Sequence, residues 1–277
     1  MSGSVLLAGA FLVLSVNAYY ILKNRHLEIA KPSFKIALAV AAFFSVTQLV
    51  VGSISAEGVA KNQPAKLAAM EGHFDSSAVA PMYLFGWVDN EKQQTTGVKI
   101  SGGLSFLIHK DLSAQVPGLN SFKPVDRPTQ VNAIFQFYHL MIIIGVASIF
   151  LTLYACWQWN KGKLFDKRWL MVIFVWSVLL PQIANQAGWF TAEMGRQPWV
   201  VYGLLRTSDA LSASVKANDI LISLIMFTVV YATLFVLFLY MMNRKIKKGP
   251  EHYLSEDEEQ NEHFSFRENP MLKTANK

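Results

Sequence analysis

The sequence predicts an all-α integral membrane protein with five transmembrane helices. Hydrophobic residues make up 52% of its 277 residues and charged residues only 16%, and the mean hydropathy is +0.29. Soluble domains typically carry about 25% charged residues. Five stretches contain no charged residue, and each is long enough to cross about 30 Å of hydrocarbon with about 20 residues. These predicted spans are 4–22, 36–56, 133–157, 169–189 and 220–242.

The charges beside the spans predict the topology. Basic residues outnumber acidic ones in 23–35, in 161–168 and in 244–248. Cytoplasmic segments carry such an excess of Lys and Arg, so we place these three inside. The connections 57–127 and 190–219 hold equal numbers of basic and acidic residues and are placed outside. The amino end is therefore outside and the carboxy end cytoplasmic, and the net charge of +6 reflects membrane orientation rather than nucleic-acid binding.

The predicted organisation has four parts. Residues 1–56 form two transmembrane helices, 57–132 a long outward loop, 133–242 three further transmembrane helices, and 243–277 a disordered cytoplasmic tail that is acidic. The single cysteine, Cys156, rules out an intramolecular disulfide framework, and no zinc or iron-sulfur spacing occurs. A metal site would therefore need a cofactor or nitrogen and oxygen ligands. No repeat pair or broken helix suggests a transporter.

Two residues of the third span are candidate haem ligands. Ionisable side chains at membrane depth are costly unless they face a protein interior, water or a cofactor. His139 is the only one of the six histidines inside a span, and Met141 follows two positions later. Positions two apart point to nearly opposite helix faces, so the two side chains cannot bind one iron. Of the two, the residues alone favour His139 as the haem or metal ligand, because imidazole is the commoner ligand; a hydrogen-bonded helix contact is the alternative interpretation of His139. Met141 is more often a core residue, although Met with His is a known haem ligand pair.

The fourth span ends in a polar face. Gln182, Asn185 and Gln186 recur at spacings of three and four, which places them together on one side of a helix near the outer surface. Such a face indicates a buried interface or a cofactor, or else contact with water at the membrane boundary.

A carboxylate, a guanidinium, an amide and two indoles follow this polar face closely. They are Glu193, Arg196, Gln197, Trp189 and Trp199. A surface ion pair flanked by interfacial tryptophans would be the simple explanation. The same group also offers an axial oxygen ligand together with side chains that pair with haem carboxylates.

In the outward loop, Lys66 and Glu71 stand five residues apart on a predicted short helix that starts near Pro64. A spacing of five residues puts the two side chains near enough along the helix to border one site. It differs from the spacing of three or four residues at which helical side chains pair best. A solvated helix face is the alternative interpretation.

Taken together, three segments resemble subunit I of the cytochrome bd family of quinol oxidases. Residues 188–199, Gly-Trp-Phe-Thr-Ala-Glu-Met-Gly-Arg-Gln-Pro-Trp, look like the family's GWxxxExGRQPW signature with each fixed position filled. Residues 66–71, Lys-Leu-Ala-Ala-Met-Glu, are similar to the start of the quinol-binding loop. Residues 138–141, Tyr-His-Leu-Met, resemble the family's segment in the third span. The resemblance runs from the first span through the fifth.

The resemblance implies a role for each candidate residue. Lys66 and Glu71 would contact the quinol, and Glu71 would accept a proton and release it outward. Met141 would be the axial ligand of the low-spin haem b iron, which replaces the preference for His139. The remaining roles fall on 189–199: Trp189 on the electron path between haems, Glu193 as ligand of the high-spin haem b iron, Arg196 neutralising haem carboxylates, and Gln197 and Trp199 as cofactor-binding residues.

The chain departs from the family in two ways. His139 occupies a position that is usually an arginine in the family, where it favours the reduced low-spin haem. Family subunit I also has nine spans, and this chain resembles only the last five. In the family, the histidine that shares the low-spin haem iron with the methionine at the position of Met141 lies just before a stretch of small residues. Residues 2–4 of this chain are similar to that stretch, so the histidine would lie just ahead of them. We therefore expect the carboxy-terminal half of a longer subunit begun at an internal methionine, or alternatively a true split subunit.

The implied function is a quinol oxidase of the bacterial cytoplasmic (inner) membrane, active only in a complex. Its cofactors would be low-spin and high-spin haem b and either haem d or a third b-type haem, with quinol as substrate. Its partners would be the missing amino-terminal half of subunit I, subunit II, small single-span subunits and membrane lipid. The alternative is a haem-free membrane scaffold or quinone-binding module derived from the oxidase.

Overall fold

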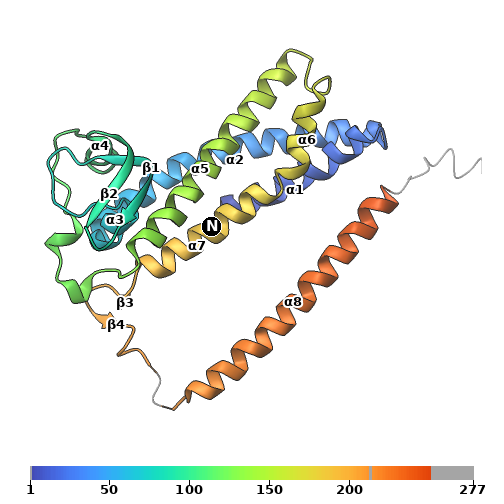
Figure 1. Cartoon of the computed structure of the whole chain (residues 1–277). Coiled ribbons are helices and arrows are strands. Elements are labelled where there is room, and N and C mark those ends of the chain that lie inside the picture. Colours follow the sequence, from blue (N-terminus) through green and yellow to red (C-terminus); the bar gives the residue numbers. More distant parts are fainter. Residues whose placement is uncertain (1, 212–213, 251–277) are drawn as a thin grey trace, which may run out of the picture. The chain divides into compact units, whose positions relative to one another are not determined.

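The computed structural model describes residues 2–211 and 214–250, and Figure 1 shows the course of the chain. The chain divides into two compact units, Met1–Ile220 and Leu221–Lys277, which are described separately. In chain order the elements are α1 (Ser2–Leu22), α2 (Leu27–Asn62), α3 (Pro64–Met70), β1 (Met82–Asp89), β2 (Gln94–Ile100), α4 (Gly103–His109), the 3₁₀ turns η1 (Leu119–Ser121) and η2 (Pro124–Asp126), α5 (Val131–Asn160), α6 (Arg168–Trp176), α7 (Leu179–Gly195), β3 (Trp199–Val201), β4 (Leu205–Arg206) and α8 (Ala217–Lys248).

Five helical segments are long and apolar enough to cross a membrane, and each predicted span falls inside one of them. The segments are Gly3–Leu22, Leu27–Asn62, Pro124–Asn160, Arg168–Gly195 and Ala217–Lys248. Large apolar side chains such as Phe43, Phe150 and Trp176 are 66–70% exposed on the helix surfaces. The protein is therefore a multi-pass membrane protein built mostly from helices, because such a surface suits lipid and not water.

The first unit is a helical bundle. Helix α1 packs against α2, α6 and α7, while α5 packs against α7 and α2 (Figure 1). Its interior is apolar: Phe11, Leu14, Phe34 and Leu38 are fully buried. Phe34 and Phe174 meet edge to face with ring centroids 5.0 Å apart, which joins α2 to α6.

The fourth span is interrupted, although the sequence predicts one continuous helix over 169–189. Helix α6 ends at Trp176 and α7 begins at Leu179. Pro181 explains the break, because proline has no N–H to donate to the carbonyl of Ser177 and its ring crowds that carbonyl. Ser177 instead makes local hydrogen bonds to the preceding turn, from its N–H to Ile173 O and from its hydroxyl to Phe174 O.

The long loop between α2 and α5 is structured and adds β structure that the all-α prediction does not contain. Strands β1 and β2 form an antiparallel hairpin with an irregularity between Tyr83 and Phe85. A second, smaller ribbon joins β3 and β4 after α7. The hairpin follows α3 and precedes α4, so the loop folds over one end of the bundle rather than running free (Figure 1).

The second unit contains the main part of α8. The described residues of this helix are apolar around most of its circumference, and none is buried within the unit. A helix with apolar residues on all sides is typical of a membrane span. Helix α8 continues to Lys248, beyond the predicted end of the span at residue 242. Residues 251–277 of the predicted tail lie outside the described residues.

Candidate functional site

Helix α3 confirms the short helix predicted around Lys66 and Glu71. Pro64 occupies its first turn, where the fixed φ of proline is helical and its missing N–H has no intrahelical partner to lose. Lys66 lies within the helix and Glu71 follows its last residue. The two side chains leave α3 in different directions, one toward α7 and the other toward α5.

Glu71 is buried, with only 1% of its surface exposed. Its Oε2 atom has no hydrogen-bond partner among the described residues. Burial raises the pKa of Glu71 to about 7, and a hydrogen bond with the Tyr138 side chain opposes that rise. A carboxyl group with a pKa near 7 can both accept and release a proton under physiological conditions. Glu71 is therefore suited to general-base chemistry.

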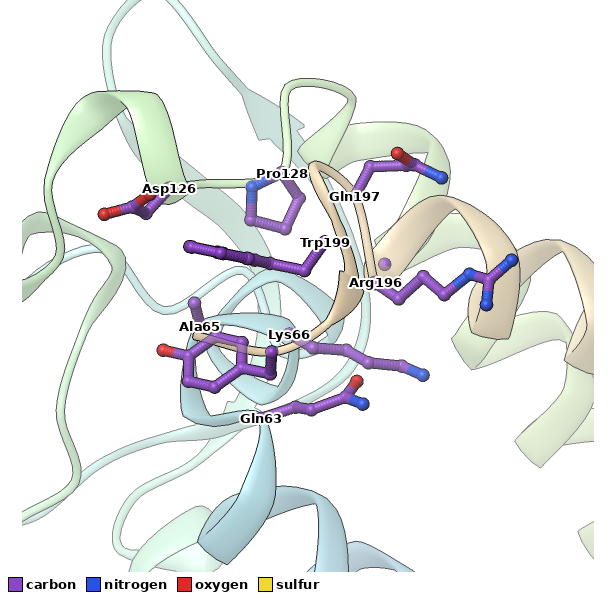
Figure 2. A pocket seen from close by; sticks show the side chains of 10 residues that line it. Gln63, Ala65, Lys66, Asp126, Pro128, Arg196, Gln197 and Trp199 are labelled. Carbon is purple, nitrogen blue, oxygen red and sulfur yellow. The ribbon is translucent and has the colours of Figure 1, made fainter. Parts of the chain in front are cut away.

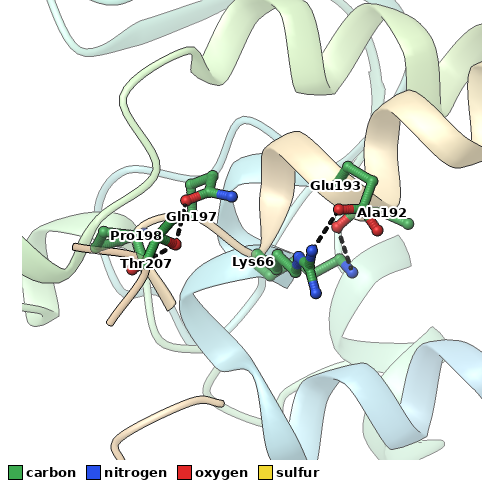
Figure 3. A network of polar contacts seen from close by, with 7 residues as sticks. Lys66, Ala192, Glu193, Gln197, Pro198 and Thr207 are labelled. Carbon is green, nitrogen blue, oxygen red and sulfur yellow. Dashed lines mark hydrogen bonds and ion pairs between the residues drawn. The ribbon is translucent and has the colours of Figure 1, made fainter. Parts of the chain in front are cut away.

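Lys66 joins α3 to α7. Its Nζ donates a hydrogen bond to Ala192 O at 3.3 Å, as Figure 3 shows. Its aliphatic stem crosses Gly195 so closely that a methyl group on Gly195 would lie 3.1 Å from Lys66 Cγ. Burial lowers the pKa of Lys66; the Glu193 carboxylate opposes this effect and the Arg196 guanidinium adds to it. Lys66 is thus a positive group in contact with the backbone of the 188–199 segment.

Glu193 and Arg196 form an ion pair at the end of α7, with Arg196 Nη2 2.6 Å from Glu193 Oε2 (Figure 3). Their side chains are 50% and 39% exposed, so the pair itself contributes little stability. The pair engages Oε2 and leaves Oε1 of Glu193 for another ligand. An exposed carboxylate held in this way fits the axial oxygen donor predicted from the sequence.

A small pocket lies between the start of α3 and the turn that follows α7 (Figure 2). Its volume is about 10 Å³, room for about one water molecule and far below the 300–1,000 Å³ typical of ligand sites. Three buried polar atoms have no hydrogen-bond partner within the part of the chain that the structure describes: Gln63 Oε1, Arg196 Nε and Trp199 Nε1. All three residues line the pocket, so it offers donors and an acceptor without enough room for a whole cofactor.

Gln197 and Trp199 are held by the β3–β4 ribbon. Gln197 Oε1 accepts a hydrogen bond from the Thr207 hydroxyl at 2.7 Å (Figure 3). Trp199 pairs with Arg206 across the ribbon, and the guanidinium lies 4.9 Å from the indole ring centroid. Arg206 also forms an ion pair with Asp126. These contacts anchor the turn after α7, and they leave the indole N–H of Trp199 available.

His139 and Met141 point to different surroundings, as their spacing predicts. His139 is 4% exposed, and each ring nitrogen faces a backbone carbonyl: Nδ1 lies 2.9 Å from Phe135 O and Nε2 lies 2.7 Å from Tyr83 O. Its ring also stacks on Phe135 at 3.9 Å between centroids. Neither ring nitrogen is therefore directed at a ligand site.

Met141 lies against α7 instead. A methyl group placed on Gly188 would be 3.1 Å from Met141 Sδ, so the absence of a side chain at Gly188 makes room for the thioether. The structure thus brings Met141 to the first residue of the 188–199 segment. The contact between Met141 and Gly188 involves no hydrogen bond, so the Met141 sulfur keeps its lone pairs for binding haem iron.

The polar face predicted on the fourth span is exposed. Gln182, Gln186, Trp189 and Glu193 follow one another at spacings of four, three and four, and all four are exposed, whereas Asn185 is half-buried. Amide and carboxylate groups at membrane depth require a partner other than lipid. Among the described residues, no three His, Cys, Asp or Glu side chains come together as they do around a bare metal ion. Met141 of α5 offers a thioether and Glu193 of α7 a carboxylate, both of which could ligate haem iron. Arg196 and Trp199, which follow α7, add buried donors without partners among the described residues.

Two residues near the site are not identified by the sequence reasoning. Tyr138 forms a hydrogen bond with the Glu71 side chain, and Gly72 adopts a left-handed φ of +60° directly after it. The contact of Tyr138 joins positions 67 residues apart in the chain (138 minus 71), which no local pattern reveals. A glycine directly after the predicted end of a short helix is the one signal that favours Gly72.

Comparison with known proteins completes the description of the site. The family model described as cytochrome bd terminal oxidase subunit I matches residues 1–250. Cytochrome bd ubiquinol oxidase subunit 1 of Bacillus subtilis (strain 168) is 32% identical over 257 residues, covering 89% of this chain and 55% of that protein. Cytochrome bd-II ubiquinol oxidase subunit 1 of Escherichia coli (strain K12) is 27% identical over 92% of this chain and 62% of its own length.

A solved structure shows the same fold. The bd oxidase of Geobacillus thermodenitrificans superposes with a TM-score of 0.78 at 30% sequence identity, covering 90% of this chain and 56% of that one. The chain therefore spans about half the length of the relatives that it matches.

Proposed function

The chain belongs to the family of cytochrome bd terminal oxidase subunit I, and on that premise we propose that it is part of a quinol oxidase that oxidises quinol at the outer face of the membrane. The relatives named as ubiquinol oxidase subunits support this activity. The observation that carries the proposal is Glu71, a buried carboxyl whose Oε2 has no hydrogen-bond partner among the described residues and whose pKa is raised by burial to about 7.

In this proposal Glu71 is the proton acceptor. A quinol becomes a quinone by losing its two hydroxyl protons and two electrons, and Glu71 Oε2 accepts a proton from the hydroxyl nearest to it. Lys66 holds the opposite side of the α3 site through its contact with Ala192 O and offers a positive group to the quinol oxygen. Glu71 then releases its proton outward, while the electrons pass into the membrane part of the protein.

The 188–199 segment and α5 would hold the haem groups. Haem, when bound, supplies one-electron redox chemistry and the reduction of oxygen. Met141 would ligate the low-spin haem b iron, which is supported by the thioether at Gly188 and by the carbonyl contacts of both His139 ring nitrogens. Glu193 would ligate the high-spin haem b iron through Oε1. The oxygen-reactive group would be haem d or a third b-type haem.

The other side chains of the segment would orient the cofactors. Arg196 Nε and Trp199 Nε1 are buried donors without partners among the described residues, and donors of this kind pair with haem carboxylates. Gln197 would help to fix the same turn. Trp189, which is 53% exposed on α7, would lie between the haem groups on the electron path.

On the basis of the charge distribution, residues 57–132 would lie outside as the quinol-binding loop, with the amino end outside and the carboxy end in the cytoplasm. The membrane would be the bacterial cytoplasmic (inner) membrane. The chain matches 55% and 56% of two relatives, and since its motifs resemble those of the last five family spans, we propose that it corresponds to the carboxy-terminal part of subunit I. The partners would then be the remaining part of subunit I, subunit II and small single-span subunits, and the chain alone would be inactive.

The test is quinol-driven oxygen uptake by membranes in which the chain is assembled with its partner chains. Glu71→Gln removes the proton acceptor but keeps the size of the side chain, and we expect the turnover rate to fall about 100-fold or more. Glu91→Gln makes the same change at an exposed position of the same loop and should leave the rate unchanged. Equal rates for the unmodified protein and Glu71→Gln would contradict the proposal.

A further inference from the structure

Three polar side chains of α5, here called the α5 row, lie along strand β1. The row consists of Asn132, Gln136 and His139, whose spacings of four and three place them on one face of the helix. Each contacts the backbone of β1. Val88 N donates to Asn132 Oδ1 at 3.2 Å and Gln136 Nε2 donates to Gly86 O at 2.8 Å, while His139 Nε2 lies 2.7 Å from Tyr83 O and donates to it in the Nε2–H tautomer. The row is thus a hydrogen-bonding ladder between a helix and a strand.

This ladder occupies the free edge of the hairpin. Strand β1 pairs with β2 on one side only, so its other edge presents backbone N–H and C=O groups without a neighbouring strand. Buried backbone groups must find partners, and side chains can supply them. The α5 row takes the place of a third strand, and Gln136 also donates to Asn132 Oδ1 at 3.3 Å, which links two members of the row.

The hairpin lies directly on the residue after Glu71. Thr95 of β2 donates from Oγ1 to Gly72 O at 2.7 Å. A methyl group on Gly72 would be 2.6 Å from Thr95 Oγ1 and 3.0 Å from Val88 Cγ2. Val88 is only 2% exposed and packs in the same apolar cluster as Phe135 of α5. Gly72 is therefore enclosed between the hairpin and α5, and the adjacent Glu71 is shielded from water.

We propose that Asn132, Gln136 and His139 are positioning residues that fix the β1–β2 hairpin over Glu71 and thereby set the geometry of the outer-face site. They would not touch the substrate, because each acts through the backbone of β1. The expected effect on quinol binding rests on the proposed function. The enclosure of Glu71 by the hairpin does not, so quinol binding and enclosure can be tested separately.

Gln136→Met is the sharpest variant, because methionine keeps the length of the side chain and removes its donor. Hydrogen exchange of the assembled full-length chain should show faster opening at the amides of 71–73 and of β1, by about fivefold, the change expected for one net hydrogen bond. The KM for quinol should rise about fivefold, while kcat stays within about twofold and the reduced haem spectrum is unchanged.

Gln130→Met is the matched control. Gln130 is exposed directly before α5, and its side chain makes no capping hydrogen bond. We expect neither exchange nor KM to change. A second pair guards against a folding defect: Asn132→Leu removes the acceptor for Val88 N and should repeat the effect, whereas Asn132→Asp keeps an acceptor oxygen and should restore the unmodified values.

Three results would overturn the proposal: unchanged exchange at 71–73 in Gln136→Met, an equal rise in Gln130→Met, or faster exchange without any change in KM in an active oxidase. If the unmodified complex oxidises no quinol, the proposed function fails. In that case, exchange at 71–73 still decides the proposal, since an increase confined to Gln136→Met and Asn132→Leu supports it and no increase overturns it.

Discussion

Lys66 and Glu71 lie five residues apart on α3 and its carboxyl end, yet they contact different helices of the bundle. Lys66 Nζ reaches the backbone of α7 at Ala192, whereas the Glu71 carboxyl is buried beside Tyr138 of α5. One short helix thus connects the loop to the two helices that carry Met141 and Glu193. This relationship places a proton acceptor and a cation next to the proposed electron path.

The first prediction concerns pH. The proton acceptor form of Glu71 is the carboxylate, and its pKa is raised to about 7. The kcat/KM for quinol should therefore rise with pH through about 7 and fall about tenfold per pH unit well below it. Rates measured from pH 5 to 9 in assembled membranes check this. If the fall in kcat/KM below about pH 7 disappears in Glu91→Gln, or persists in Glu71→Gln, Glu71 is not the proton acceptor.

Stability should respond to pH with the opposite sign. Burial makes the pKa of Glu71 higher in the folded protein than its ordinary value of 4.5, so the fold favours the protonated form. The resulting stabilisation is complete below about pH 4.5 and is lost as pH rises through about 7. It amounts to about 3 kcal/mol at 1.36 kcal/mol per pKa unit. The difference in melting temperature between Glu71→Gln and the unmodified protein should shift in favour of the variant over this range; a constant difference would argue against a buried acid.

Lys66→Met should weaken quinol binding. Methionine keeps the apolar stem over Gly195 but removes the ammonium that donates to Ala192 O. In the proposed site the same ammonium also donates to the quinol oxygen. Loss of a hydrogen bond from a charged group typically costs about 1.5–3 kcal/mol, so we expect the KM for quinol to rise about tenfold or more. Lys61→Met, at an exposed lysine in the last turn of α2, serves as the control. Similar KM values for both variants would remove Lys66 from the site.

Gly72→Ala should destabilise the loop more than the same change elsewhere. Gly72 has a φ of +60°, and a methyl group added to it would lie 2.6 Å from Thr95 Oγ1. Gly162 has a φ of +71° with nothing within 4 Å among the described residues, so Gly162→Ala pays only the backbone cost of about 1–2 kcal/mol. Overpacking adds about 1–3 kcal/mol at Gly72. Thermal unfolding should separate the two variants, and equal melting temperatures would show that the hairpin does not enclose Gly72.

Met141→Leu should remove the low-spin haem b band from the reduced-minus-oxidised spectrum of the assembled complex, because leucine offers no ligand atom. Met226→Leu, at an exposed methionine of α8, should leave the band intact. His139→Gln should also retain it, since both ring nitrogens of His139 face carbonyls rather than a cofactor. Loss of the band in His139→Gln with retention in Met141→Leu would reverse the ligand assignment.

The membrane part of the fold can be predicted from the sequence because lipid imposes a simple requirement on charge and length. Four of the five charge-free stretches fall inside one long helix each, and the stretch 169–189 is divided between α6 and α7. The break at Ser177 is not predicted, although Pro181 is the residue that causes it; proline within an apolar run is also tolerated in continuous spans. The β1–β2 hairpin is missed because its stability comes from α5, whose polar row meets β1 about 50 residues away in the chain.

The candidate site is predictable only in part for the same reason. The short helix carrying Lys66 and the polar face of α7 follow from local spacing and are present. His139 shows where unaided reasoning ends. The sequence leaves both a ligand and a hydrogen-bonded helix contact open for it, and its neighbour Tyr83 O comes from the loop, which periodicity does not reveal. The burial of Glu71, on which the proposed chemistry depends, likewise requires the tertiary structure.

The central claim is that the chain takes part in quinol oxidation coupled to oxygen reduction. The most direct measurement is oxygen uptake driven by quinol in membranes of cells that lack every other terminal oxidase, with this chain either present or deleted and its partner chains expressed in both. We predict uptake that requires the chain and falls about 100-fold or more with Glu71→Gln. Uptake that is the same with and without the chain, or its complete absence from a haem-loaded complex that contains the chain, would contradict this account.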